Sequence, residues 1–141
     1  MTLKPNPLVN KAAAWPLLVE ATKELVYLSE SETPFAAVQD SIPRAEFEAK
    51  NAREQTGRGI QELVEKLSVS EFFSELTESQ EWHGPAEKQT VNRYRALHRI
   101  FTEMLAASTV FKIGQIKVTI LIVGRTSDGY WVGARTEAIE T

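Results

Sequence analysis

Two carboxylates, Glu30 and Glu32, alternate with serines in the polar segment 29–34. A carboxylate pair can perform acid–base catalysis when burial raises the pKa of one member, but a hydrophilic loop rarely provides that burial. A solvated turn is therefore the simpler interpretation of this segment. The functional alternative is that the loop presents its carboxylates to a cation on a binding partner.

A tryptophan, Trp82, lies in the polar stretch 77–85, between Glu81 and His83. Packing into the core is the more frequent fate of such a residue, because tryptophan is highly buried on average. Exposure would instead favour a contact surface, since tryptophan is enriched among the residues that dominate binding energy. The preceding stretch 71–81 holds four glutamates and no lysine or arginine, which suits a cationic partner.

The last residue, Thr141, follows a strand-like stretch and combines a hydroxyl group with an α-carboxylate. Both groups are hard oxygen ligands of the kind that Mg²⁺ prefers. Chain ends usually fray, so an idle terminus is the simpler interpretation. If the preceding strand holds the terminus in place, these oxygens become candidates for a contact with a partner's metal ion.

No arrangement of residues in the sequence indicates a catalytic centre. The chain has no cysteine, which excludes disulfides, thiolate metal ligands and thiol nucleophiles. Nucleotide-binding glycine motifs and the GxSxG nucleophile motif do not occur, and Gly57-Arg58-Gly59 is too short for a phosphate loop, so it indicates a backbone constraint. The histidines, His83 and His98, are too distant for one helix to place both on one metal. We therefore expect no enzyme activity, no cofactor and no metal in the free protein, and a small-molecule enzyme or ligand carrier is the weakest hypothesis.

Three arginines, Arg93, Arg95 and Arg99, lie near His98 on the polar positions of a predicted helix. Such a face can bind phosphates, but the net charge of −3 and the lack of interleaved aromatic residues weaken that interpretation. A solvated helix face is the simpler explanation. We expect no direct contact with nucleic acid and none with an anionic membrane.

The length and hydropathy of the chain limit its class. Its 141 residues suit one domain. No apolar run reaches the roughly 18 residues that span a bilayer, and residues 1–10 lack the pattern of a signal peptide. We expect a cytoplasmic protein that is a monomer when free. Residues 1–12, which include two prolines, are predicted to form a flexible N-terminal arm before a domain over 13–141.

Apolar residues recur every three or four positions in several segments, which predicts amphipathic helices. Pro16 fits the first turn of one such helix, which we expect to end near Leu28. Ser68 and Glu71 form a capping-box pattern before a short apolar helix. The remaining predicted helices cover residues 44–55, 60–67 and 86–107.

The last quarter of the chain has a strand-like character instead. The run 118–123 is apolar almost throughout, as in a strand buried on both faces. Asp128-Gly129 is a strong turn signal before a second strand over 131–139, so the two segments predict a hairpin. Residues 35–38 are a candidate for a further short strand. Because helices come first and strands cluster late, we predict an α/β (α+β) fold with helices packed on a largely antiparallel sheet.

Four segments carry motifs that become specific only in combination: LSESETPF (28–35), QTGRG (55–59), EFFSELTESQEW (71–82) and the closing block 111–141. The SESE-x-P motif, the Q-E-W loop and the final E-T are each weak signals. In order and spacing, the segments together resemble the nuclease A inhibitor family. The resemblance covers residues 16–141.

The resemblance implies a single-domain α-β-α sandwich that forms a 1:1 complex with a sugar-non-specific, Mg²⁺-dependent DNA/RNA endonuclease. Matched motif by motif, the partner-binding residues are Glu30, Gln80, Trp82 and Thr141, with Glu32 and Glu81 beside them. The expected roles are oxygens of Glu30 and Thr141 toward the partner's Mg²⁺ and an apolar contact at Trp82, all on one exposed face. A second hypothesis keeps the fold but assigns a different role, that of a non-inhibitory interaction module for another basic protein.

Overall fold

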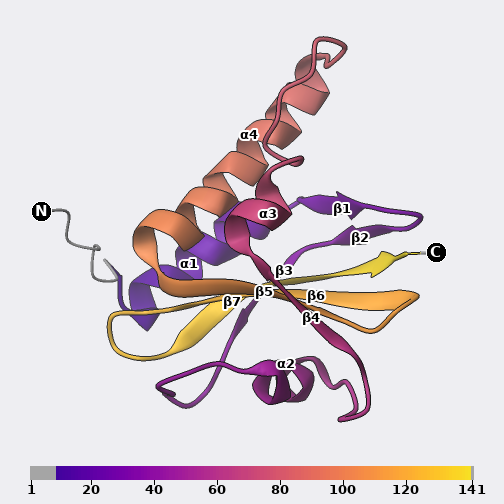
Figure 1. Ribbon diagram of the computed structural model, residues 1–141. Helices are drawn as coiled ribbons and strands as arrows, with labels where there is room; N and C mark the ends of the chain where they lie inside the picture. Colours follow the sequence, from indigo (N-terminus) through magenta and orange to yellow (C-terminus); the bar gives the residue numbers. More distant parts are fainter. Residues whose placement is uncertain (1–8, 141) are drawn as a thin grey trace, which may run out of the picture.

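A five-stranded antiparallel sheet forms the centre of the protein in a computed structural model, which describes residues 9–140 (Figure 1). The strand order across the sheet is β3-β7-β6-β5-β4. The strands are β3 (Ala36–Gln39), β4 (Val64–Ser68), β5 (Ala106–Ile113), β6 (Lys117–Arg125) and β7 (Trp131–Ile139). Every neighbouring pair of strands is antiparallel, as the sequence predicted.

Strand β6 lies in the middle of the sheet because its side chains are apolar on both faces. The residues from Val118 to Gly124 are all buried, and such continuous burial requires cover on both sides. β6 is joined to β7 by the turn that contains Asp128 and Gly129, and Gly129 has a φ of 87°, which suits glycine. The predicted strand over 118–123 and the predicted hairpin are both confirmed.

Helices cover both faces of the sheet (Figure 1). On one face lie α1 (Lys11–Thr22), α3 (Val69–Phe73), α4 (Pro85–Arg99) and the π-helical turn η1 (Ile100–Met104) that continues α4. The opposite face is covered by α2 (Ala49–Thr56). Within residues 9–140, none of the helices is both long and apolar enough to cross a membrane. The architecture is therefore a single α+β domain in which the sheet lies between two helical layers.

Two hydrophobic cores fill the spaces between the helices and the sheet. The larger core packs Leu18 of α1 and Leu97 of α4 against the same face of the sheet as Ile120. The smaller core packs Phe47 against Trp131, with ring centroids 5.6 Å apart. Burial of each large apolar side chain contributes about 1.5–3 kcal/mol, so both layers stabilise the sheet.

A small hairpin precedes the main sheet. Its strands, β1 (Val26–Leu28) and β2 (Glu32–Pro34), pair in an antiparallel arrangement. The helix that we predicted to end near Leu28 ends at Thr22, so that prediction is wrong. Glu24 adopts a left-handed φ of 60°, which stops the helix, and the residues after it pair as a hairpin instead.

The helix predicted over residues 60–67 is wrong as well, because residues 64–68 form strand β4. This strand pairs with β5 in a register that runs from Val64 opposite Ile113 to Ser68 opposite Thr109. The apolar spacing in this segment fits a helix, but pairing with a strand that is distant in the sequence decides the conformation.

The long helix predicted over residues 86–107 is confirmed as far as the end of η1 at Met104 and is wrong beyond it. Ala106 already pairs with Arg125 in the sheet. The last predicted helical residues therefore belong to β5, a strand that the apolar period did not reveal.

Two helix starts show how local and tertiary signals compete. The serine half of the predicted capping box is confirmed, since the Ser68 hydroxyl accepts a hydrogen bond from the Glu71 backbone N–H at 3.0 Å. The helix predicted over 44–55 begins only at Ala49. The reason is tertiary, because the Arg44 carbonyl, which a helix starting there would use for its first hydrogen bond, accepts from the Trp131 indole N–H at 3.0 Å instead.

The first helix begins earlier than Pro16 indicated. It starts at Lys11, and the Asn10 side chain accepts a hydrogen bond from the Ala13 backbone N–H at 2.9 Å. Because this cap satisfies a donor of the first turn, the helix forms upstream of the proline, which lies inside it. Of the predicted N-terminal arm, residues 1–8 lie outside the described residues.

Candidate functional site

The first candidate group lies at the tip of the β1–β2 hairpin. Ser29, Glu30 and Ser31 connect the two strands, and Glu32 begins β2. The Ser29 backbone N–H donates to the Ser31 carbonyl at 2.9 Å, and the Ser31 N–H donates to the Ser29 hydroxyl at 3.2 Å. The two serines therefore close the turn, and both glutamates are exposed.

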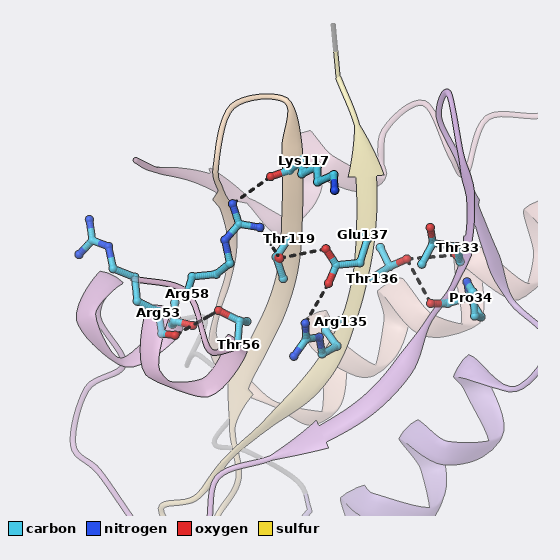
Figure 2. Close-up of polar contacts among 11 residues, drawn as sticks. Thr33, Pro34, Arg53, Thr56, Arg58, Lys117, Thr119, Arg135, Thr136 and Glu137 are labelled. Carbon is cyan, nitrogen blue, oxygen red and sulfur yellow. Dashed lines mark hydrogen bonds and ion pairs between the residues drawn. The ribbon is translucent and has the colours of Figure 1, made fainter. Parts of the chain in front are cut away.

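The hairpin is fixed to the end of β7. The Ile139 backbone N–H donates to the Ser29 hydroxyl at 3.1 Å. The Thr136 hydroxyl lies within hydrogen-bonding distance of the carbonyls of Thr33 and Pro34, at 3.1 and 3.2 Å (Figure 2). These contacts place the carboxylates of the hairpin tip beside the last residues of the sheet.

The base of the hairpin is held by the helical layer. The Tyr94 hydroxyl on α4 donates to the Val26 carbonyl at 2.7 Å, and burial raises the pKa of this phenol, which keeps it a donor at neutral pH. Tyr27 stacks on Phe72 with ring centroids 5.8 Å apart, and burial raises its pKa too. The segment that carries Glu30 is thus packed against helices as well as bonded to β7.

The second candidate group lies in the loop of residues 78–84 between α3 and α4, which we call the tryptophan loop. Trp82 is 74% exposed, so the core-packing interpretation of this residue is wrong. Its ring packs edge-on against His83, with centroids 4.3 Å apart. The Gln80 N–H donates to His83 Nδ1 at 3.1 Å, and the His83 N–H donates to the Gln80 carbonyl at 3.1 Å. The loop therefore presents Gln80, Glu81 and Trp82 on an internally bonded, exposed turn.

The two groups occupy different parts of the surface. The tryptophan loop lies at the end of α4 that projects away from the sheet, whereas the hairpin tip lies next to the end of β7 (Figure 1). Thr141 lies outside the described residues and follows Glu140 directly in the sequence. A partner that contacts every predicted residue must therefore reach from the end of the sheet to the end of α4.

An arginine of the QTGRG motif, Arg58, joins the end of α2 to the sheet (Figure 2). The helix ends at Gly57 in a left-handed conformation with a φ of 72°, which confirms the predicted backbone constraint there. The Arg58 guanidinium donates to the Lys117 carbonyl at 3.0 Å and to the Thr119 hydroxyl at 3.2 Å. Thr119 in turn donates to the Glu137 carboxylate at 3.1 Å. Hydrogen bonds thus run from α2 across β6 to β7.

Gly114, in the turn between β5 and β6, provides the space for this arginine. It has a φ of 106°, and a Cβ at this position would lie 2.3 Å from Arg58 Nη2 and 2.3 Å from the Lys117 carbonyl oxygen. Both contacts are too short for a real side chain, so only glycine allows the guanidinium to reach β6. Nothing in the QTGRG motif itself indicated that Arg58 shapes the site.

The arginines of α4 make contacts within the protein. Arg93 donates to the Lys23 carbonyl, and Arg95 donates to the Thr77 carbonyl at 3.0 Å. Arg99 pairs with a glutamate of the following turn at 3.8 Å. These contacts favour the interpretation of an ordinary helix face over that of a phosphate-binding surface.

The two histidines have structural contacts. His98 stacks on Phe73 with ring centroids 4.9 Å apart, and burial lowers the pKa of its imidazole. His83 is bonded within the tryptophan loop. Among residues 9–140, no group of three or more His, Cys, Asp or Glu residues is arranged to hold a metal ion.

The sequence comparison assigns these parts to one family. Residues 13–141 match the sequence model of the family described as Nuclease A inhibitor-like protein. No curated protein matches the chain. The matched range contains the hairpin tip, the tryptophan loop and the Arg58 motif.

Proposed function

Because the chain belongs to the nuclease A inhibitor-like family, we propose that it binds 1:1 over the active site of a sugar-non-specific, Mg²⁺-dependent DNA/RNA endonuclease and blocks it. The protein acts by occupying the nuclease stoichiometrically and performs no catalysis of its own. A phosphodiester-cleaving enzyme of this kind needs a cationic cleft and a metal ion, so its inhibitor must offer oxygens that compete with phosphate.

The observation that carries this proposal is the fixed position of the hairpin tip beside the end of β7. Carboxylate oxygens are ligands that Mg²⁺ prefers, and Glu30 and Glu32 are exposed at this tip. Because the tip is bonded to β7 and the base of the hairpin is held by α4, little conformational entropy is lost when a partner binds. In the proposed complex, Glu30 approaches the metal directly or through water, and Thr141 adds an oxygen ligand.

The tryptophan loop supplies the second contact. An exposed tryptophan held by an aromatic neighbour offers a large apolar surface at a low entropic cost, which is typical of residues that dominate binding energy. Trp82 has these properties. In the proposed complex it packs against the nuclease, with Gln80 as a hydrogen-bonding neighbour and Glu81 as an added negative charge.

The test is a titration of a sugar-non-specific, Mg²⁺-dependent endonuclease with the purified protein, followed by plasmid cleavage. We expect cleavage to disappear at equimolar inhibitor. Replacement of Trp82 by alanine should raise the dissociation constant about 30-fold, equivalent to about 2 kcal/mol. The matched control is Ile42→Ala, which removes another exposed apolar side chain in a different loop and should leave inhibition unchanged.

Two outcomes would count against the proposal. Full nuclease activity in the presence of excess folded protein would show that the protein does not inhibit this endonuclease. Binding without loss of cleavage would favour the alternative of a non-inhibitory interaction module. Deletion of Thr141 tests the proposed contact between this residue and the metal. Inhibition should weaken if its oxygens reach the active site and should stay unchanged if they do not.

A further inference from the structure

Four segments meet at the end of the sheet that carries the hairpin tip, and we call this region the loop end. They are the hairpin tip (29–31), the end of β7 (139–140), the turn between β5 and β6 (114–116) and the loop before β4 (57–63). Backbone hydrogen bonds join Glu140 N–H to the Ile116 carbonyl and Gly114 N–H to the Leu63 carbonyl, both at 2.9 Å. The segments therefore form one continuous surface, which Figure 1 shows at the right and lower right of the view.

The loop end exposes an unusual amount of apolar surface. Ile60 is 87% exposed, Leu63 60% and Ile116 62%. Single exposed apolar residues are common, but these three come from two loops that touch each other. With Leu28 of the hairpin, four of the eight large exposed apolar residues in the described part of the chain lie at this end. Such clustering is typical of a contact surface.

The backbone beneath these side chains is firmly held. Arg53 donates twice to the Glu62 carbonyl, at 3.0 and 2.9 Å, and the Arg58 guanidinium lies 3.3 Å from the Glu62 carboxylate. Arg58 also bonds to the β6 backbone across Gly114. The loop is therefore ordered although its apolar side chains are exposed. Its backbone loses conformational entropy on folding, so little more is lost when a partner binds.

A hollow lies beside the point where the two loops meet. It has a volume of about 520 Å³ and is lined by residues that include Leu63, Ile116, Arg58 and Lys117. The adjoining hollow is lined by residues that include Leu63, Val118 and Glu140, so it extends toward the end of β7. Leu63 and Ile116 thus border a concave region that extends toward Glu140 at the end of β7.

We propose that Ile60, Leu63 and Ile116 form an apolar patch that docks on the nuclease beside the active-site cleft entered by the hairpin tip. This inference rests on the proposed function. The partner surface is an apolar or aromatic rim next to a cationic cleft, because acidic groups and apolar groups adjoin each other at the loop end. By excluding water around the carboxylate–cation contact, the patch strengthens that contact, as the ring of residues around a binding hot spot does.

Two features of the patch favour a nuclease as its partner: its connection to the hairpin tip and the negative charge of that tip. Two hydrogen bonds connect the patch to the hairpin tip: the Glu140 N–H donates to the Ile116 carbonyl, and the Ile139 N–H donates to the Ser29 hydroxyl. The acidic residues Glu30 and Glu32 at the tip complement a cleft that binds phosphodiesters. A second copy of this chain carries the same acidic tip and offers no cationic cleft to receive it.

The experiment measures binding of the same endonuclease to two matched variants by surface plasmon resonance. Ile116→Ser and Ile42→Ser each change one exposed loop isoleucine, and the exposed fractions are 62% and 51%. We expect Ile116→Ser to raise the dissociation constant several-fold and the triple variant Ile60→Ser, Leu63→Ser, Ile116→Ser to raise it at least about tenfold. Ile42→Ser should leave it within a factor of about two, as expected for a residue outside the interface.

The outcomes separate this inference from the proposed function. Equal affinity of the wild-type protein and the triple variant overturns the apolar patch while inhibition stands. Absence of binding by the wild-type protein overturns both. Analytical ultracentrifugation of the free protein tests the other occupant, because a dimer that the triple variant abolishes would identify a self-association surface. Circular dichroism tests whether each variant is folded. If the triple variant does not fold, the affinity of Ile116→Ser alone decides whether the patch binds the nuclease.

Discussion

The two ends of the central sheet differ in how they use their polar and apolar groups. At the end opposite the loop end, which we call the turn end, residues 126–130 connect β6 to β7. There the Thr126 hydroxyl donates to Asp128 at 2.6 Å, and the Lys11 backbone N–H donates to the same carboxylate at 2.9 Å. The Lys11 ammonium lies 4.3 Å from the Tyr130 ring centroid. The turn end thus uses its functional groups for contacts within the protein.

The loop end has an equally ordered backbone but keeps side chains exposed. Arg58 and Ser29 fix the loops through hydrogen bonds, while Glu30, Ile60 and Ile116 remain at the surface. The exposed isoleucines leave apolar surface in contact with water, which is unfavourable, and the stability of the fold does not require this exposure. A surface whose backbone is held while its side chains stay exposed is therefore preorganised for a partner.

The largest expected difference between the two ends concerns their glycines. Gly114→Ala should destabilise the protein by about 2–4 kcal/mol, because a left-handed φ and a clash with Arg58 and the Lys117 carbonyl act together. Gly129→Ala should cost about 1–2 kcal/mol, since its φ is also left-handed but the nearest atom, on Pro43, lies at an ordinary 3.8 Å. Urea unfolding of both variants measures the difference. Equal losses would show that the Arg58 contact does not restrict the loop end.

The next largest effect is on binding. Glu30→Gln removes a charge at the hairpin tip and should weaken nuclease binding by about 2 kcal/mol if the carboxylate faces the metal. The matched control is Glu46→Gln, which changes an exposed glutamate in the loop that precedes α2 and should leave affinity unchanged. Isothermal titration calorimetry gives both values. A similar loss in the two variants would show that net charge, rather than the position of Glu30, determines affinity.

Arg58 and Arg44 offer a third comparison, since each joins a loop to the rest of the structure. Arg58→Ala should cost about 1–3 kcal/mol of stability through the lost charged hydrogen bonds and should also weaken nuclease binding. Arg44→Ala breaks the contact with Asp40 at 2.5 Å and should lower stability without changing affinity. Thermal unfolding and binding are measured on the same samples. Arg58→Lys, which keeps the charge but not the paired donors, should fall between wild type and Arg58→Ala.

The smallest effect is the pH dependence of the turn end. The hydrogen bond from Thr126 holds the pKa of Asp128 below its usual value, so the ionised form stabilises the folded state. This contribution is complete above the unfolded-state pKa of about 3.9 and is lost as the pH falls through the lower folded-state value. Because Asp128 is exposed, Asp128→Asn should cost about 0.5 kcal/mol or less at pH 7, and the difference should shrink as the pH falls below about 4. Urea midpoints that differ equally at all pH values would contradict this account.

The sequence predicted the elements whose signals are local. The Asp128-Gly129 turn and the Ser68 cap are defined by residues within a few positions of each other, and both are present as predicted. The apolar residues of 118–123 lie on both faces of the strand, which indicated that both faces are covered, and the two cores provide that cover. The layered α+β architecture follows from these signals together with the helical periods.

Elements that depend on distant pairing could not be predicted in this way. The apolar spacing of 60–67 fits a helix, and only the register with β5 makes residues 64–68 a strand. The hairpin of β1 and β2 is held by Tyr94 and Thr136, whose partners in the hairpin lie 68 to 103 positions away. Local propensity contains no information about such contacts.

The candidate site shows the same limit. The motifs located the hairpin tip and the tryptophan loop, but the exposure of Trp82 opposes the average behaviour of tryptophan and became known only from the structure. Arg58 was visible as part of QTGRG, yet its partners Lys117 and Thr119 lie 59 and 61 positions away. A motif can therefore mark a residue without revealing what the residue contacts.

The exposed isoleucines of the loop end have a consequence for evolution. Ile60 and Ile116 belong to neither core, so their replacement changes folding stability by only about 0.5 kcal/mol, as is usual for surface positions. Selection can therefore alter these side chains almost without a folding penalty, while the glycine and arginine beneath them keep the loops in place. A scaffold of this kind can change its exposed side chains without losing the arrangement of its loops.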